Sequence, residues 1–339
     1  MAAAITTTLI ALVAALATAG DAAAQAQYTR CENAGDATLV QVSAASCDDA
    51  RAAASALDGK PATSSESALR AAGWSALRAA AADTGEQYDV VAIRGRAALR
   101  IRRSGAAPDL DGWAAGRELL FARGQLIGGR PPPRGAAVCT SAFLIRLGGH
   151  PGGLSAAHCG GTRTDGTTQR RNAALRRPPQ PGIVVGRVQR NLARTRPLDA
   201  LVLPVPSGAG RPSAAVVDRG VSRPPWFVAG VGRPLSGRRV CFTGRTSGVD
   251  QCGEIVSSSK RRAELLLSAF AGTRVRCTTI RAREGDSGGP VYTAARTDGS
   301  VYAVGITTLV VGAAARMCFT PIEPVLAALG GRLVIAAGA

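Results

Sequence analysis

The pattern of apolar and polar positions divides the chain into two parts. From residue 28 to about residue 123, apolar and polar residues alternate in short runs, and a serine precedes an acidic, alanine-rich stretch. This pattern predicts a small α+β module with a helix from Ser46 to about Leu57 and strands at 38–43, 88–93 and 97–102. Gly95 suits the turn between the last two strands. Pro61 and the serines at 64, 65 and 67 predict a loop.

The second part begins near Leu126 and has a different pattern. Gly and Pro recur every few residues, helical periodicity disappears, and short apolar runs lie between turns. The spacing favours a β-sandwich or β-barrel, with strands predicted at 142–147, 182–186, 198–205, 226–228, 239–242, 263–268 and 301–309. One helix is predicted at 321–329, because it begins at a proline and ends at Gly330.

The N-terminus has the pattern of a secretory signal peptide. An apolar run from Ile5 to Ala19 is too short for a confident membrane span and is soon followed by Asp21. Small residues offer cleavage sites near residue 24, although the first residues include no Lys or Arg. We therefore expect residues 1–26 to be a signal peptide, residues 27–126 an accessory or pro-domain, and residues 127–339 a secreted domain without a membrane span.

The cysteines fit an oxidising compartment. There are 8 of them, an even number that allows four disulfides between successive cysteines. Zinc is the alternative, but the chain has no C-x-x-C pair and only 2 histidines. We expect neither a metal nor another cofactor.

The net charge of +18 raises the possibility of a polyanion partner. The excess of basic side chains lies in residues 127–339, and nearly all of them are arginines, as a coding bias would produce. Aromatic residues make up only 4% of the chain, too few for a base-stacking surface. A solvated basic surface without specific nucleic-acid recognition is the favoured interpretation.

One glycine-rich stretch has the pattern of a nucleophile turn: Glu284-Gly-Asp-Ser-Gly-Gly-Pro290. Glycines allow a tight turn that presents the Ser287 hydroxyl, and the N–H groups of Gly285 and Ser287 could together stabilise a tetrahedral oxyanion. A surface turn is the alternative. The distinction depends on whether a histidine and a carboxylate lie upstream.

Both partners are present upstream. His158 follows a short apolar strand in Leu154-Ser-Ala-Ala-His-Cys159, whereas His150 lies among glycines and suits a solvated loop. Asp199 is embedded in apolar neighbours, where an unpaired carboxylate would be costly. The competing Asp165 lies in a turn-like Thr-Asp-Gly-Thr segment.

The order His158, Asp199, Ser287 resembles that of the chymotrypsin-like serine endopeptidases, and the segments around Cys139 and Cys241 resemble the bacterial secreted branch of α-lytic protease and the streptogrisins. The resemblance covers about residues 127–339, with Ile127-Gly-Gly129 similar to a mature start. It implies a general base at His158, an orienting carboxylate at Asp199 and a nucleophile at Ser287.

The resemblance also implies a fold and further site residues. We expect an all-β domain of two packed antiparallel six-stranded β-barrels with a C-terminal helix, and an oxyanion hole from the N–H groups of Gly285 and Ser287. The substrate-pairing strand would include Thr308, Leu309 and Val310. With one bridge expected in the first module, the implied disulfides are Cys31–Cys47, Cys139–Cys159, Cys241–Cys252 and Cys277–Cys318.

Three features of the sequence depart from that pattern. Cys277 lies ten residues before Ser287, a longer spacing than relatives usually have. Phe242 stands where relatives often carry an arginine that pairs with the aspartate before the nucleophile. The partner of Asp286 is therefore open between Arg239, Arg245 and a freed Ile127 amine, which would make the chain a zymogen. Leu309 and Val310 replace glycines, which favours small or medium apolar side chains before the scissile bond.

The expected function is a secreted serine endopeptidase, monomeric, acting on protein or peptide substrates. Two alternatives come from other classes. The first is an inactive protein with a protease fold that only binds partners, and the second is a basic protein that binds the cell envelope or a polyanion.

Overall fold

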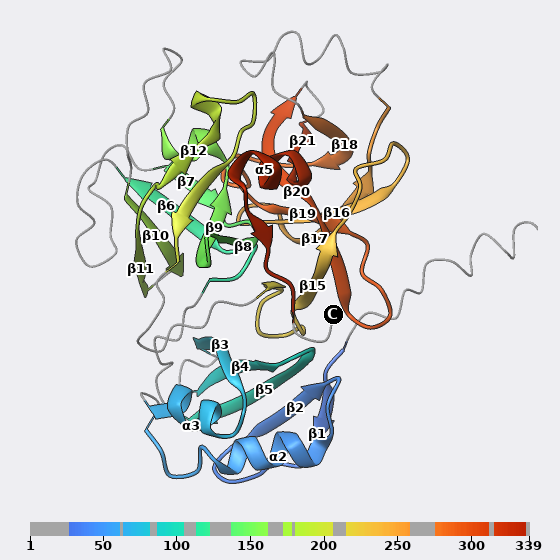
Figure 1. The fold of residues 1–339 in the computed structure, drawn as a ribbon. Coiled ribbons are helices and arrows are strands. Elements are labelled where there is room, and N and C mark those ends of the chain that lie inside the picture. The colour runs from blue at the N-terminus through green and yellow to red at the C-terminus, as the bar shows by residue number, and fades with distance from the viewer. Residues whose placement is uncertain are drawn as a thin grey trace, which may run out of the picture.

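The computed structural model describes residues 27–61, 64–81, 87–104, 113–122, 137–161, 172–177, 180–205, 215–257, 275–311 and 315–336. These residues form a small α+β module and two β-domains (Figure 1). No helix among them is long and apolar enough to cross a membrane. The predicted signal peptide and the predicted strand at 263–268 lie outside the described residues.

The module is a five-stranded antiparallel sheet with two helices. Its strand order is β1-β2-β5-β4-β3. The elements are β1 (Thr29–Cys31), β2 (Leu39–Ser43), α2 (Cys47–Ser55), α3 (Ser65–Ala71), β3 (Ser75–Ala81), β4 (Gln87–Arg94) and β5 (Ala97–Ser104). The predicted helix begins as expected, because the Ser46 hydroxyl accepts a hydrogen bond from the Asp49 N–H at 3.1 Å.

The helix α3 corrects the loop predicted around residues 61–67. Its serines occupy the first turn, where Ser67 donates to the Ser64 carbonyl at 2.9 Å. The helix buries Ala68 and Leu69 against the sheet, and this packing outweighs the weak helix propensity of serine. The sequence pattern also missed β3.

The two faces of the module sheet have different partners. Val90 and Leu99 pack with the helices in one buried cluster. Their sequence neighbours Val91 and Ala98 point the other way and share a cluster with Trp226 of the second β-domain. In Figure 1 the helices accordingly lie on the side of the sheet away from the β-domains. The module is therefore a layer packed on both faces.

The first β-domain contains two sheets, ordered β11-β10-β6-β7 and β12-β13-β9-β8-β22. Its last strand, β22, comes from the C-terminus and pairs with β8. The elements are β6 (Glu118–Ala122), β7 (Ala137–Thr140), β8 (Leu144–Leu147), β9 (His150–Ser155), η2 (Ala157–Gly160), β10 (Asn172–Arg177), β11 (Gln180–Arg187), β12 (Arg190–Asn191), η3 (Leu192–Arg194), β13 (Leu201–Pro204) and β22 (Arg332–Leu333).

The second β-domain is a single sheet ordered β14-β15-β20-β19-β16-β17, to which β18 and β21 are added. The predicted final helix, α5, ends at Gly330, whose φ of +62° suits glycine. The elements are β14 (Val216–Val217), β15 (Trp226–Val231), β16 (Arg239–Gly244), β17 (Gly248–Glu254), β18 (Arg276–Arg281), β19 (Pro290–Thr293), β20 (Ser300–Val311), β21 (Arg316–Pro321) and α5 (Ile322–Leu329). The all-β class predicted for this part is confirmed.

The predicted boundary between residues 126 and 127 is wrong. Strand β6 lies between β7 and β10 of the first β-domain, so residues 118–122 belong to that domain. Trp113 is buried there as well, and a Cβ on Gly153 would lie 2.3 Å from its ring. A pattern of short apolar runs could not reveal this, because it does not say which strands pair. The β-domains therefore begin at or before Trp113.

Two polar contacts join the module to the β-domains. The Arg117 guanidinium donates to the Leu77 carbonyl at 3.0 Å, and Arg96 forms an ion pair with Asp298 at 3.0 Å. Asp298 follows the last residue of β19, whereas Ser287 precedes the first. The module is therefore anchored at the end of β19 opposite the predicted nucleophile.

Candidate active site

His158 and Asp199 meet between two neighbouring strands of the first β-domain. The histidine lies in η2 after β9, and the aspartate precedes β13, which pairs with β9. Asp199 is 1% exposed, and its Oδ2 atom lies 2.8 Å from the Nδ1 atom of His158. Its Oδ1 atom accepts from the His158 N–H at 2.9 Å. The carboxylate therefore fixes both the backbone and the ring of the histidine.

This contact also changes the basicity of His158. Burial alone would lower the pKa of the imidazole, but the negative charge of Asp199 and the hydrogen bond to it outweigh burial and raise the pKa above its ordinary value. Since the carboxylate occupies Nδ1, a proton accepted from a serine would have to go to Nε2.

Ser287 lies on a turn that requires its glycines. Gly285 and Gly288 have φ values of +96° and +89°, where a residue with a Cβ is strained. A Cβ on Gly288 would also lie 2.2 Å from the Ser155 hydroxyl, and one on Gly285 would lie 2.5 Å from the Thr246 hydroxyl. The turn thus packs against both β-domains, because Ser155 belongs to the first and Thr246 to the second.

Thr140 joins this turn to the histidine. Its N–H donates to the Ser287 carbonyl at 2.7 Å, and its hydroxyl donates to the Gly285 carbonyl at 2.8 Å. The preceding residue, Cys139, is bridged to Cys159, whose sulfur lies 3.9 Å from the Ser287 carbonyl oxygen. The structure therefore brings the backbone of Ser287 next to the residue that follows His158.

The turn also offers two backbone donors. Its carbonyl groups accept from Thr140, but within the described residues the N–H groups of Gly285 and Ser287 have no hydrogen-bond acceptor. Both residues precede Gly288, whose N–H donates to the Thr307 carbonyl at 2.7 Å. Two N–H donors that lie two residues apart on one turn can together bind an oxygen that carries negative charge.

Asp286 is held by neither of the two arginines considered for it, Arg239 and Arg245. Asp286 is fully buried, and its carboxylate accepts from the N–H groups of Thr246, Ser247 and Arg283 at 2.7–2.9 Å and from the Ser247 hydroxyl at 2.5 Å. Four donors satisfy this carboxylate without an arginine. Ile127 itself lies outside the described residues.

Arg245 has a different partner, Glu118 on β6. The carboxylate of Glu118 is buried, so the pair holds the tip of the β16–β17 hairpin against the first β-domain. The next two residues, Thr246 and Ser247, donate their N–H groups to Asp286. The ion pair therefore also helps to position the nucleophile turn.

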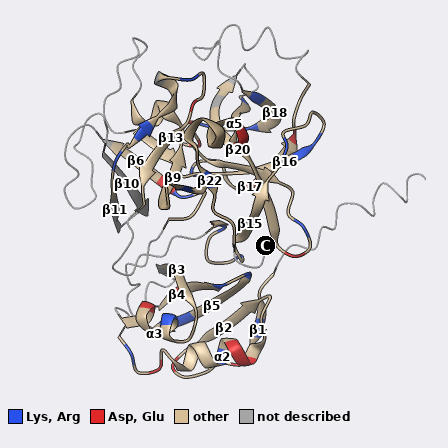
Figure 2. Ribbon diagram, viewed as in Figure 1, with Lys and Arg blue, Asp and Glu red and all other residues tan. Residues whose placement is uncertain are grey.

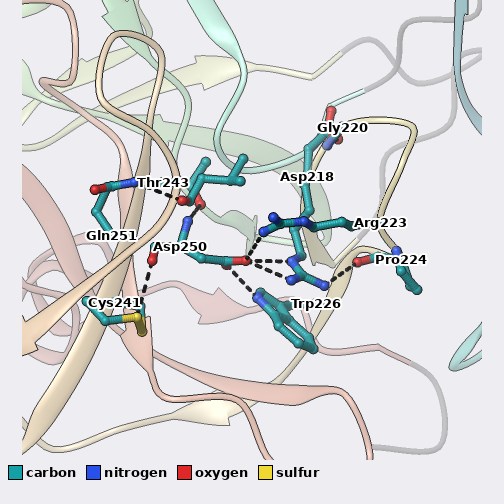
Figure 3. A network of polar contacts seen from close by, with 12 residues as sticks. Asp218, Gly220, Arg223, Pro224, Trp226, Cys241, Thr243, Asp250 and Gln251 are labelled. Carbon is teal, nitrogen blue, oxygen red and sulfur yellow. Dashed lines mark hydrogen bonds and ion pairs between the residues drawn. A yellow bond between two sulfur atoms is a disulfide. The ribbon is translucent and has the colours of Figure 1, made fainter. Parts of the chain in front are cut away.

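A largely buried network holds β17 of the same hairpin (Figure 3). Asp250 accepts from Arg219 at 2.8 Å, from Trp226 at 2.7 Å and from the Tyr292 hydroxyl at 2.9 Å. The Arg219 guanidinium also lies 3.7 Å from the centre of the Trp226 ring. Burial and the Asp250 charge raise the pKa of Tyr292 well above its usual value, so its hydroxyl stays protonated and donates. The network fixes the segment between the β-domains to β17 and β19.

The predicted substrate strand is the C-terminal half of β20. Thr308 is buried and bonds to the Thr320 hydroxyl at 2.7 Å, whereas Val310 is 41% exposed. Leu309 pairs in register with Cys318, and its side chain is not among those described. Beyond Ile306, no described strand pairs with the β20 edge that β19 occupies before it. Thr307 on this edge already bonds to Gly288 and Gly289, so an extended peptide that adds to the sheet would pair beyond it.

All the described cysteines form disulfides. The structure contains Cys31–Cys47, Cys139–Cys159, Cys241–Cys252 and Cys277–Cys318, with no free cysteine among the described residues. Cys139, His158 and Cys159 approach one another as metal ligands would, but their sulfurs are bonded to each other. A disulfide lacks the thiolates that such a site needs.

The competing residues lie elsewhere. His150 is exposed at the start of β9, and Asp165 lies outside the described residues. Sequence reasoning missed Thr140, Asn191 and Ser247, which position the site. Asn191 donates to the Ala157 carbonyl at 3.1 Å and so holds the turn of His158. None of these contacts has a sequence signature, because each joins segments that are distant in the chain.

Comparisons with known proteins found similar solved structures but no match in sequence. No protein-family model matches the chain, and no curated protein matches it in sequence. Similar solved structures include Thermobifida fusca Protease A, at 25% identity over 65% of this chain and 97% of that chain, with a TM-score of 0.44. A Nocardiopsis protease has 20% identity over 65% and 97%, with a TM-score of 0.43.

An alpha-lytic protease homologue has 21% identity over 64% of this chain and 97% of that chain, with a TM-score of 0.46. All three are proteases by name. The site described above lies where the two β-domains of this chain meet, because the Ser287 turn packs against Ser155 of the first and Thr246 of the second.

Proposed function

We propose that the chain is a secreted serine endopeptidase that hydrolyses peptide bonds through Ser287, His158 and Asp199. One observation supports this most strongly. The buried Asp199 carboxylate holds the His158 ring at 2.8 Å, and the residue after His158 contacts the carbonyl of Ser287 at 3.9 Å. An inactive binding protein would have no need of a buried carboxylate that orients a histidine beside a serine turn.

The chemistry follows from the positions of the atoms. The Ser287 hydroxyl oxygen attacks the scissile carbonyl carbon, and its proton moves to Nε2 of His158. The carbonyl oxygen takes the negative charge and accepts from the N–H groups of Gly285 and Ser287. His158 then gives the proton to the leaving amine, which yields an acyl-enzyme, and a water repeats the sequence to release the acid.

The disulfides and the N-terminal pattern support export. A described part with four disulfides and no free cysteine suits an oxidising compartment. We include in the proposal that residues 1–26 are a signal peptide and that the enzyme acts as a monomer on protein or peptide substrates, without a metal or cofactor.

The module is proposed to be a retained accessory domain rather than a plug in the active site. Its inner face is buried against the second β-domain, and its ion pair with Asp298 lies at the end of β19 opposite Ser287. A propeptide that blocks the substrate edge of β20 would instead have to contact residues near Thr308.

The test is hydrolysis of casein by the purified full-length protein. We expect the wild type to release peptides and Ser287→Ala to lose the activity, because no other group can form the acyl-enzyme. Ser257→Ala, in another segment of the second β-domain, is the matched control and should keep full activity. Both variants should keep the circular dichroism spectrum of the wild type. A wild type without activity, or a fully active Ser287→Ala, would contradict the proposal.

A further inference from the structure

A pocket of about 350 Å³ adjoins the nucleophile turn and contains two arginines. One wall consists of Thr246 and Ser247, the residues that hold Asp286, and the opposite wall includes Arg281 and Arg283. Arg283 lies four residues before Ser287, and its own N–H donates to Asp286 at 2.7 Å. The pocket therefore shares its walls with the residues that fix the nucleophile.

The arginines of this pocket lack an acidic partner in the described part of the chain. Arg281 and Arg283 are both exposed, and no ion pair joins either side chain to a carboxylate there. Figure 2 shows the basic residues of β18, which ends at Arg281. Unlike these two, Arg245 nearby has Glu118 as its partner.

The acidic groups close to the pocket are already engaged or point to solvent. Asp286 is fully buried and accepts from three N–H groups and a hydroxyl. Glu118 is taken by Arg245. Glu284 is exposed, and within the described residues it forms no ion pair with either arginine. The pocket consequently presents positive charge that nothing described in the chain neutralises.

Both charged side chains that line the pocket are guanidinium groups, those of Arg281 and Arg283. Guanidinium groups suit carboxylates because two parallel N–H groups match two oxygens.

We propose that this pocket binds the side-chain carboxylate of an Asp or Glu next to the scissile bond, and that Arg281 and Arg283 determine this preference. The proposal rests on the proposed function and names the substrate class for it. It replaces the expectation of a small or medium apolar side chain, which rested on Leu309 and Val310 alone.

The experiment maps cleavage sites in casein by mass spectrometry with the full-length protein. We expect Asp or Glu to be enriched at one fixed position beside the cleaved bond. For a peptide with Glu at that position, the double variant Arg281→Gln/Arg283→Gln should lower kcat/KM by about 10-fold or more, the loss expected for one charged hydrogen bond. A matched peptide with Gln should be cleaved equally by both proteins.

Arg233→Gln, an exposed arginine outside the pocket, is the matched control and should leave both kcat/KM values unchanged. Labelling of Ser287 by a fluorophosphonate separates the two claims. If the wild type labels but shows no acidic preference, or the double variant keeps the Glu-to-Gln ratio, the pocket assignment is wrong and the enzyme assignment stands. If the wild type neither labels nor cleaves, the enzyme assignment fails and the pocket assignment fails with it.

Discussion

At the scale of single residues, the site depends on how Asp199 and His158 share a proton. Asp199 is almost fully buried, and both of its carboxylate oxygens contact His158. Its negative charge therefore acts mainly on the histidine. That charge outweighs the burial of the imidazole and raises its pKa. Only the neutral imidazole can accept the serine proton, so the raised pKa sets the lower pH limit of activity.

The first prediction concerns this limit. In the wild type, kcat/KM should rise with pH and reach half its maximum above the ordinary histidine pKa of about 6.5. Asp199→Asn removes the charge that raises the pKa, so the midpoint should move to lower pH. It also permits the wrong tautomer, so kcat should fall by about 10⁴-fold. A pH profile of peptide-ester hydrolysis measures both, and an unchanged midpoint would contradict the role given to Asp199.

At the scale of elements, the module sheet contains a buried carboxylate that joins two strands. Asp89 on β4 is 1% exposed and bonds to Arg100 and Arg102 of β5 at 2.8–3.0 Å. Burial opposes ionisation, but the hydrogen bonds and charges of the two arginines lower the pKa of Asp89. A carboxyl with a lowered pKa stabilises the fold above its unfolded pKa, and this stability is lost as the pH falls through the folded value.

The second prediction follows from the lowered pKa of Asp89. Asp89→Asn should cost about 3 kcal/mol at pH 7, because it leaves two arginines without their buried partner. The difference from the wild type should shrink as the pH falls below about 4, where the carboxyl of the unfolded chain takes up a proton before that of the folded protein. Thermal unfolding at several pH values measures it. Asp48→Asn, which removes an 85% exposed carboxylate, is the control and should cost less than about 1 kcal/mol.

The elements also show how far the sequence could predict the fold. Alternation and capping residues predicted β2, β4, β5, α2 and α5, because these patterns are local. Strand β6 was missed because its apolar run is short and its partners, β7 and β10, both lie later in the chain. The residues expected to carry the chemistry lie on motifs that can be recognised in the sequence. The positions of Thr140 and of the pocket arginines could not be predicted, because they depend on contacts between segments that are distant in the chain.

At the scale of the whole molecule, the first β-domain cannot be separated from the residues before Ile127. Strand β6 is an inner strand of its sheet, and Arg117 forms an ion pair with Asp218 at 2.9 Å in the segment that enters the second β-domain. A chain that began at Ile127 would lack both. An inner strand supplies hydrogen bonds on two edges, so its loss removes the partner of β7 and exposes one edge of β10, which still pairs with β11.

The third prediction is therefore the N-terminus of the secreted protein. With the module retained and the signal peptide removed, mass spectrometry should find a start near Gln25 or Gln27. A start between residues 105 and 112 would contradict retention of the module. A start at Ile127 would contradict the domain boundary as well.

The central claim is that Ser287 is an activated nucleophile. Its most direct measurement is labelling of the full-length protein with a fluorophosphonate, followed by peptide mass spectrometry to locate the adduct. The account predicts one adduct per chain, on Ser287, and its loss when His158 is replaced by alanine in a protein that remains folded. An adduct on another residue, or no adduct on the folded wild type, would contradict it.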